Sequence, residues 1–169
     1  MLVPIWIAPW ELACCQPEAQ LNEAWEALAL VLGDPEPWWA SGAREALTPI
    51  QLNLGVVEVE YDHVGSIGGK DLLRIAGLLT VVSEAPVGAQ QGTVRGRLRL
   101  EAHDEELQLP ALKCRGNVRR IQRVPLIYTE TKPRHWYPCW QLDPVEVAST
   151  VERAERDELL IELEVTPGA

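Results

Sequence analysis

The sequence predicts a mainly β protein, a single antiparallel barrel or curled sandwich of about seven to nine strands with one late helix. Apolar and polar residues alternate with a period of two over several separate stretches, the pattern of half-buried strands. Glycine and proline clusters fall between these stretches at intervals that suit a meander. The length of 169 residues, with 47% hydrophobic and 24% charged residues, indicates one folded domain over residues 1–169.

The first ten residues form an apolar run that Pro4 and Pro9 interrupt. The run has no basic leading segment and Glu11 follows at once, so it predicts a first strand rather than an export signal. No apolar run approaches the roughly 20 residues that a membrane helix requires, so no membrane contact is expected. We therefore expect a cytoplasmic protein with reduced cysteines.

Residues 21–32 fit two structures. Alanine, glutamate and leucine favour a helix by propensity, whereas Leu21, Trp25, Ala27 and Ala29 also fit one face of a strand. The proline-rich segment 34–42, which carries two tryptophans, is expected to form a packed loop.

The clearest strand covers residues 93–101. Leu98 and Leu100 share one face of it, and Arg97 and Arg99 share the other. Further strands are expected over residues 52–61, 72–82, 116–128 and 159–165.

Three features interrupt or end these elements. Pro125 should break the strand over 116–128, because proline has no N–H for the sheet. The glycine-rich stretch 65–69 is expected to be a hairpin turn, since it lacks the spacing of a phosphate-binding loop. Asp143 followed by Pro144 resembles a helix start, which predicts a helix over 144–156.

Four segments are similar, in the same order, to those of a family of uncharacterised proteins from high-GC bacteria. They are Trp6 and Trp10 followed by Cys14-Cys15, Asp34-Pro35-Glu36 with Trp38-Trp39, Glu101-Ala102-His103, and Arg115-Gly116-Asn117-Val118-Arg119. The resemblance covers about two thirds of the chain, and Gln16 and Asp104 depart from the family pattern. It implies an all-β build, hence a strand over residues 21–32, and implies no particular activity.

Charge is unevenly distributed along the chain. The net charge is −10, yet ten of the 15 basic residues lie between Arg95 and Arg134, against five of the 25 acidic ones. An acidic protein is a poor general binder of nucleic acid, because phosphate neutralisation drives that affinity. The basic stretch either forms an anion-binding face or pairs with acidic neighbours inside the fold.

The leading functional interpretation is a non-enzymatic binding module for a protein partner or a small ligand, with no cofactor. Exposed tryptophans and oriented arginines are typical of such surfaces. If the loops that carry these tryptophans instead folded over one end of a barrel, the indole rings would be buried. Self-association through a sheet edge or the same loops would give a homodimer. The candidate surface consists of Trp38, Trp39, Trp136, Trp140, Arg95, Arg97, Arg99, Arg119 and Arg123.

The alternative is a metal- or thiol-dependent enzyme. Cys14 or Cys15, His103 and Cys114 offer the sulfur and nitrogen ligands that zinc prefers, although no local pair has the usual ligand spacing. A cysteine nucleophile would need one of the three histidines as its base. Cysteines are also among the most buried residue types, and core packing competes with both interpretations.

Overall fold

The computed structural model confirms a mainly β protein. It describes residues 1–8, 11, 19–36, 53–101, 103–107, 109–133, 135–141, 144–147 and 157–165. The strands are β1 (Leu2–Ile7), β2 (Ala24–Gly33), β3 (Val56–Ile67), β4 (Lys70–Ile75), β5 (Leu79–Ser83), β6 (Gln91–Glu101), β7 (Lys113–Val124), β8 (Leu126–Lys132), β9 (His135–Gln141), β10 (Val145–Glu146) and β11 (Glu158–Val165). Two 3₁₀ turns, η3 (Glu105–Leu107) and η4 (Pro110–Leu112), lie between β6 and β7.

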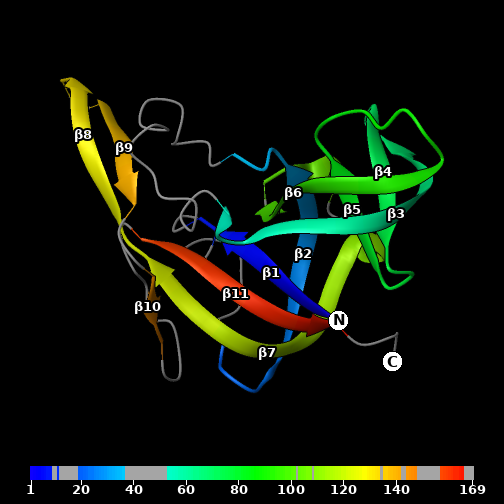
Figure 1. The fold of residues 1–169 in the computed structure, drawn as a ribbon, viewed down its shortest axis with the longest axis horizontal. Helices are drawn as coiled ribbons and strands as arrows, with labels where there is room; N and C mark the ends of the chain where they lie inside the picture. The colour runs from blue at the N-terminus through cyan, green and yellow to red at the C-terminus, as the bar shows by residue number, and fades with distance from the viewer. Residues whose placement is uncertain are drawn as a thin grey trace.

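Nine strands form one sheet in the order β10-β7-β11-β1-β6-β2-β5-β4-β3, and β8 pairs with β9 in a separate hairpin (Figure 1). Two additional pairings, β7–β2 and β6–β3, close the sheet on itself twice. One closed circuit contains β2, β5, β4, β3 and β6. The other contains β2, β7, β11, β1 and β6. The two circuits share the β2–β6 pair, which is therefore paired along both of its sides.

Strand β6 belongs to both circuits because its partner changes along its length. It pairs with β3 over residues 91–97, then with β1 at Leu98 and Arg99, while residues 97–101 pair with β2. At Gly96 a Cβ atom would come within 2.5 Å of the carbonyl oxygen of Gly33, so only glycine permits this close approach of the two backbones.

The sheet is mostly antiparallel, but it is not purely antiparallel as the sequence predicts. Strand β1 runs parallel to β6, and β2 runs parallel to β5, each over two residue pairs. The other pairs of described strands are antiparallel, including β1 with β11, which binds the two ends of the described chain together. The Met1 amino group donates to the Val165 carbonyl at 3.0 Å, and the Val165 N–H donates to the Met1 carbonyl at 2.8 Å.

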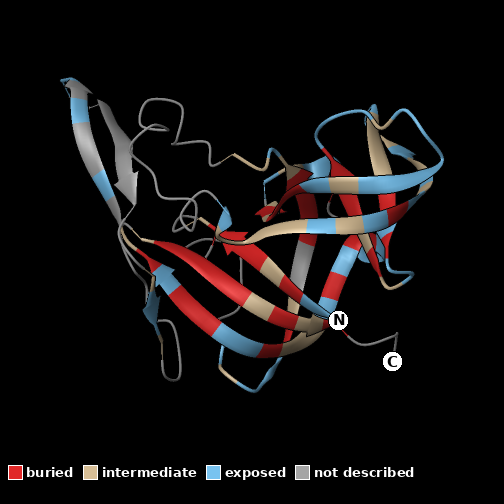
Figure 2. Cartoon of the chain, viewed as in Figure 1, coloured by how far each residue is buried: buried red, intermediate tan, exposed pale blue. Residues whose placement is uncertain are grey.

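The main core lies inside the closed sheet and follows the predicted alternation (Figure 2). Leu98 and Leu100 of β6 lie in this core together with Leu30 and Leu32 of β2. Residues 24–33 form strand β2, which confirms the strand alternative for the ambiguous segment. A smaller core on the other face includes Ala29, Val31 and Leu107.

Two elements differ from the prediction. The stretch 72–82 is two strands, β4 and β5, separated by a turn that contains Ala76 at φ 50° and Gly77 at φ 68°. The predicted helix over 144–156 does not begin at Pro144, because Val145 and Glu146 form β10 and pair with Arg123 and Gln122 of β7. The rest of that segment, 148–156, lies outside the described residues. Pro125 does separate two strands, β7 and β8.

The tryptophans divide into three groups. Trp6 and Trp25 are buried, as expected of core residues. Trp136 and Trp140 lie on strand β9 rather than in a loop. Trp10, Trp38 and Trp39 fall outside the described residues. Within the part of the chain that is described, no helix has the length and apolar character to cross a membrane.

Candidate functional site

A pocket of about 590 Å³ opens where β1 and β6 end and β11 begins. The parallel pairing sets Trp6 beside Arg99, and the antiparallel pairing on the other side of β1 sets Ile7 beside Leu159. The residues that follow Trp6 and Arg99, and Glu158, which precedes Leu159, therefore meet at one end of three adjacent strands. The lining of this β1–β6 pocket consists of Trp6, Ala8, Glu11, Val31, Arg99, Leu100, Glu101, His103 and Glu158.

Glu11 reaches the pocket from the turn that follows β1. Its N–H donates to the Ala8 carbonyl at 3.0 Å, and its Oε2 accepts the Ala8 N–H at 3.1 Å. These two reciprocal hydrogen bonds hold the side chain back over the end of β1. Only 6% of Glu11 is exposed, so its carboxylate belongs to the pocket wall rather than to the outer surface.

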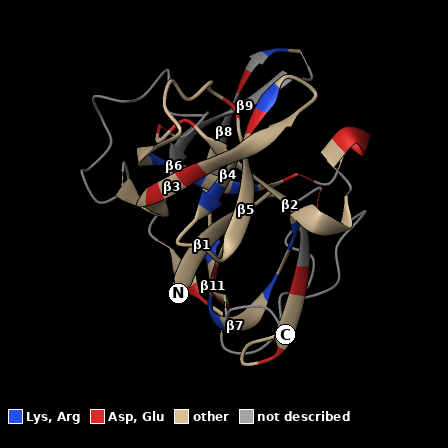
Figure 3. Ribbon diagram, turned by 90° about the vertical axis from the view of Figure 1, so that its right-hand side faces the viewer, with Lys and Arg blue, Asp and Glu red and all other residues tan. Residues whose placement is uncertain are grey.

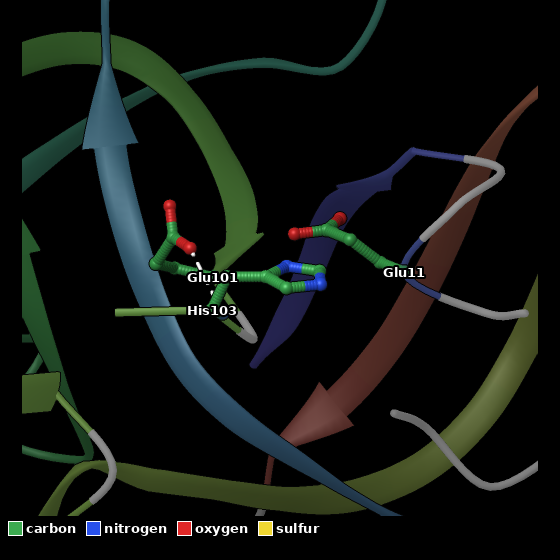
Figure 4. A group of neighbouring side chains, drawn as sticks. All are labelled: Glu11, Glu101 and His103. Carbon is green, nitrogen blue, oxygen red and sulfur yellow. Dashed lines mark hydrogen bonds between the residues drawn. The ribbon is translucent and has the colours of Figure 1, made fainter. Parts of the chain in front are cut away.

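Glu101 and His103 enter the pocket from the end of β6. The His103 N–H donates to Glu101 Oε1 at 3.1 Å, and the His103 ring points toward the Glu11 carboxylate (Figure 4). Each of the three residues offers one nitrogen or carboxylate oxygen, and these three atoms lie within 4.8 Å of one another. Two carboxylates and an imidazole therefore converge from two segments about 90 residues apart in the sequence.

The residue after His103 anchors this arrangement. Asp104 Oδ2 accepts a 2.8 Å hydrogen bond from Lys70 Nζ on β4, and its Oδ1 accepts the Glu106 N–H at 3.1 Å. The hydrogen bond from Lys70 is the main reason that the pKa of Asp104 lies below its ordinary value. Leu107, at the end of the same turn, is buried in the smaller core. The backbone that follows His103 is thus fixed by an ion pair and by a buried side chain.

Trp6 forms an apolar wall of the pocket and is itself held in place. The guanidinium carbon of Arg97 lies 5.9 Å from the centre of the Trp6 ring, within the range of a cation–π contact. Arg97 is buried and donates from Nε to the Leu54 carbonyl at 3.1 Å and from Nη1 to the Pro35 carbonyl. Burial lowers the pKa of Arg97 to about 10.

The pocket lining carries an excess of negative charge. Glu11, Glu101 and Glu158 contribute three carboxylates, and Glu158 is only 4% exposed. Among the described residues of the lining, Arg99 is the one arginine or lysine, and its Nη2 donates to Glu84. Negative potential in a partly desolvated cavity favours a cationic occupant, because opposite charges attract more strongly where water is excluded.

The cysteine ligand set proposed from sequence is only partly described. Cys114 is 1% exposed in the main core, on β7, and burial raises the pKa of its thiol to about 12. Cys14 and Cys15 lie outside the described residues. Among the described residues, His103 is grouped with Glu11 and Glu101 rather than with Cys114.

The arginines proposed as a recognition surface mostly contact acidic or polar groups of the same chain. Basic and acidic positions both occur along the strands (Figure 3). This is the arrangement expected if basic strands pair with acidic neighbours. The contacts are Arg95 with Asn53 at 2.6 Å, Arg99 with Glu84, Arg119 with Glu164 at 2.6 Å, and Arg123 with Asp157 at 3.1 Å. Trp136 and Trp140 lie on β9, which pairs with β8 in a sheet separate from the one that bears these arginines.

Sequence reasoning missed Glu11, Glu101 and Glu158 as site residues. One usable signal was present for Glu11, which is the first charged residue after a ten-residue apolar run. A second signal was the acidic-then-histidine segment that ends the clearest predicted strand. These two signals do not reveal that Glu11 lies beside the segment 101–103, because that proximity depends on the parallel pairing of β1 with β6.

Comparisons with known proteins add no relative to this description: no family model, no curated protein and no solved structure matches the chain. The family resemblance drawn from short motifs therefore stays a prediction.

Proposed function

We propose that the protein is a binding module that holds a small, positively charged ligand in the β1–β6 pocket. The observation that carries the proposal is the convergence of three glutamates and one histidine on a 590 Å³ cavity. Two of these glutamates, Glu11 and Glu158, are more than nine-tenths buried. Burying carboxylates is costly unless hydrogen bonds or positive charge compensate them, and a bound cation would add to that compensation.

The walls of the pocket support binding rather than covalent chemistry. Trp6 lines the pocket as an aromatic side chain, and aromatic side chains are suited to contact with an organic cation. The buried Cys114 thiol has a raised pKa and lies in the core, which supports a packing role for this residue. The intramolecular contacts of the arginines favour a small ligand over a protein partner.

The test uses ligand-observed NMR with small organic cations, namely guanidinium, choline and spermidine, and with acetate and phosphate as anionic counterparts. Saturation transfer to the cations, with none to the anions, is the expected result. Ala8→Trp should abolish saturation transfer to the cations, because the new ring would enter the pocket. The backbone N–H of residue 8, which donates to Glu11, is retained in this variant.

The matched control is Val64→Trp, which introduces the same ring at an exposed position on β3. It should bind the cations as the native protein does. Binding of none of the cations, equal binding of anions, or unchanged binding by a folded Ala8→Trp variant would each overturn the proposal.

A further inference from the structure

We propose that Glu11, Glu101 and His103 form a divalent metal centre within the β1–β6 pocket. The inference rests on the proposed function, since it places a divalent metal ion among the cations that the pocket binds. The three donor atoms already lie within 4.8 Å of one another. Ligands of one zinc ion, at about 2.0–2.2 Å from the metal, are separated by roughly 3–4 Å in tetrahedral or octahedral geometry. Small side-chain rotations would therefore bring all three atoms onto one ion.

The supporting structure fixes the carboxylates and the histidine without preventing ligation. Glu11 and Glu101 each accept a backbone N–H on one oxygen, at 3.1 Å in both cases. A carboxylate can accept such a bond and still coordinate a metal, and this kind of orienting contact is usual around metal sites. The Lys70–Asp104 ion pair fixes the backbone beside His103 and thereby helps to orient the imidazole.

The donor set selects the kind of metal. Two carboxylates and a neutral imidazole bring a charge of −2, which a divalent cation balances. An imidazole nitrogen favours Zn²⁺ or Co²⁺ over Mg²⁺, Ca²⁺ and Mn²⁺, which suit oxygen ligands. Among these ions zinc is expected to bind most tightly, by the usual order of divalent affinities.

Three protein ligands also leave at least one coordination position open. Because the donors line a cavity of about 590 Å³, that position faces space large enough for a small molecule. Structural zinc sites are closed by four protein ligands, whereas three-ligand sites accept water or another ligand. The geometry thus points to an ion that serves to hold a further small ligand rather than to support the fold.

The experiment is calorimetric titration of the chelator-treated, tag-free protein with Zn²⁺, and separately with Mg²⁺. We expect one Zn²⁺ per chain and no measurable Mg²⁺ binding under the same conditions. Glu101→Gln and His103→Gln should each weaken Zn²⁺ binding by at least tenfold. The matched controls Glu60→Gln and His63→Gln make the same changes on β3, away from the three donors, and should bind Zn²⁺ as the native chain does.

Bound Co²⁺ provides an independent spectroscopic readout. Its visible absorption should change in the His103→Gln variant, because a nitrogen ligand is lost, and should persist in a Cys14→Ser/Cys15→Ser variant. Loss of Zn²⁺ binding in that cysteine variant, with full binding by Glu101→Gln, would overturn the proposed ligands in favour of a thiolate site. Unchanged Zn²⁺ binding in both pocket variants would show an adventitious ion.

Failure of this inference is distinguishable from failure of the proposed function. If organic cations bind and Ala8→Trp abolishes that binding, while Zn²⁺ does not bind, the pocket function stands and the metal centre is overturned. If neither class of cation binds, both proposals are overturned.

Discussion

Lys70 on β4 and Asp104, the residue after His103, form an ion pair with an Nζ–Oδ2 distance of 2.8 Å. The two residues connect the first closed circuit of strands to the turn that carries the candidate ligand. Both side chains are partly exposed, so the pair adds little to the free energy of unfolding. Its main effect is to hold the backbone beside the pocket.

We expect Lys70→Ala to weaken Zn²⁺ binding by roughly tenfold, the scale at which orienting contacts usually act. The melting temperature should change little. Lys113→Ala is the control, because Lys113 on β7 forms a comparable 2.6 Å ion pair with Glu26 on β2. This variant should bind Zn²⁺ with the affinity of the native protein. Equal affinities in the two variants would contradict a positioning role for Lys70.

A second prediction concerns Gly55, which precedes β3 with a φ of 65°. A Cβ there would lie 2.3 Å from Trp6 Nε1, so Gly55→Ala combines backbone strain with a clash. We expect a loss of about 2–4 kcal/mol in the free energy of unfolding. Gly77 has nearly the same φ, 68°, but no atom lies within 4 Å of an added Cβ. Gly77→Ala should therefore lower the free energy of unfolding by only about 1–2 kcal/mol. Urea denaturation of both variants measures the difference, and equal losses would rule out the clash.

The third prediction concerns the thiol of Cys114. Its 1% exposure and a pKa raised to about 12 by burial leave almost no reactive thiolate at pH 8. A maleimide pulse on the native protein should leave the peptide containing Cys114 unmodified, whereas the same pulse in concentrated urea should label it. Cys114→Ser should also destabilise the fold by about 1–3 kcal/mol, because a hydroxyl is costly in an apolar core. Rapid labelling of Cys114 in the native state would contradict this placement.

The fourth prediction is a pH dependence that involves Asp71. The Val87 N–H donates to its Oδ2 at 2.7 Å and lowers its pKa from the ordinary 3.8, with a smaller contribution from the hydrogen bond to His63. Since the folded-state pKa lies below the unfolded one, the stabilisation is fully present above pH 3.8. It is lost as the pH falls from there through the folded-state pKa. Asp71→Asn should therefore show a shallower fall of stability with acid below that pH. Denaturation curves collected across this range measure it, and parallel pH profiles for the two proteins would contradict the assignment.

Sequence patterns located the strands that bury one face continuously, such as β6 and β11. They merged β4 and β5, because the turn between them contains a single glycine and begins with Ala76 in a left-handed conformation. They also favoured a helix after Asp143. Tertiary contacts override that local signal, since Glu146 pairs with β7 and its carboxylate accepts hydrogen bonds from Arg120 and Gln122.

The candidate site was less predictable than the fold. The sequence identified His103 as a candidate metal ligand, but it suggested cysteines as the other ligands. Cys114 lies instead in the core, because the alternation along β7 places it among the inward-facing residues. The meeting of His103 with Glu11 depends on the pairing of β1 with β6 at two residue positions, which no local pattern encodes.

The pairing of β1 with β11 has a consequence for biosynthesis. The first circuit, β2 to β6, uses only residues 24–101 and can close while the rest of the chain is still being made. The second circuit cannot close until β11 has left the ribosome, roughly 150 residues after β1. At about 5–20 residues per second, the edge of β1 that pairs with β11 stays unpaired for roughly 8–30 s. Nascent chains in that interval are the form of the protein most exposed to aggregation and to chaperones.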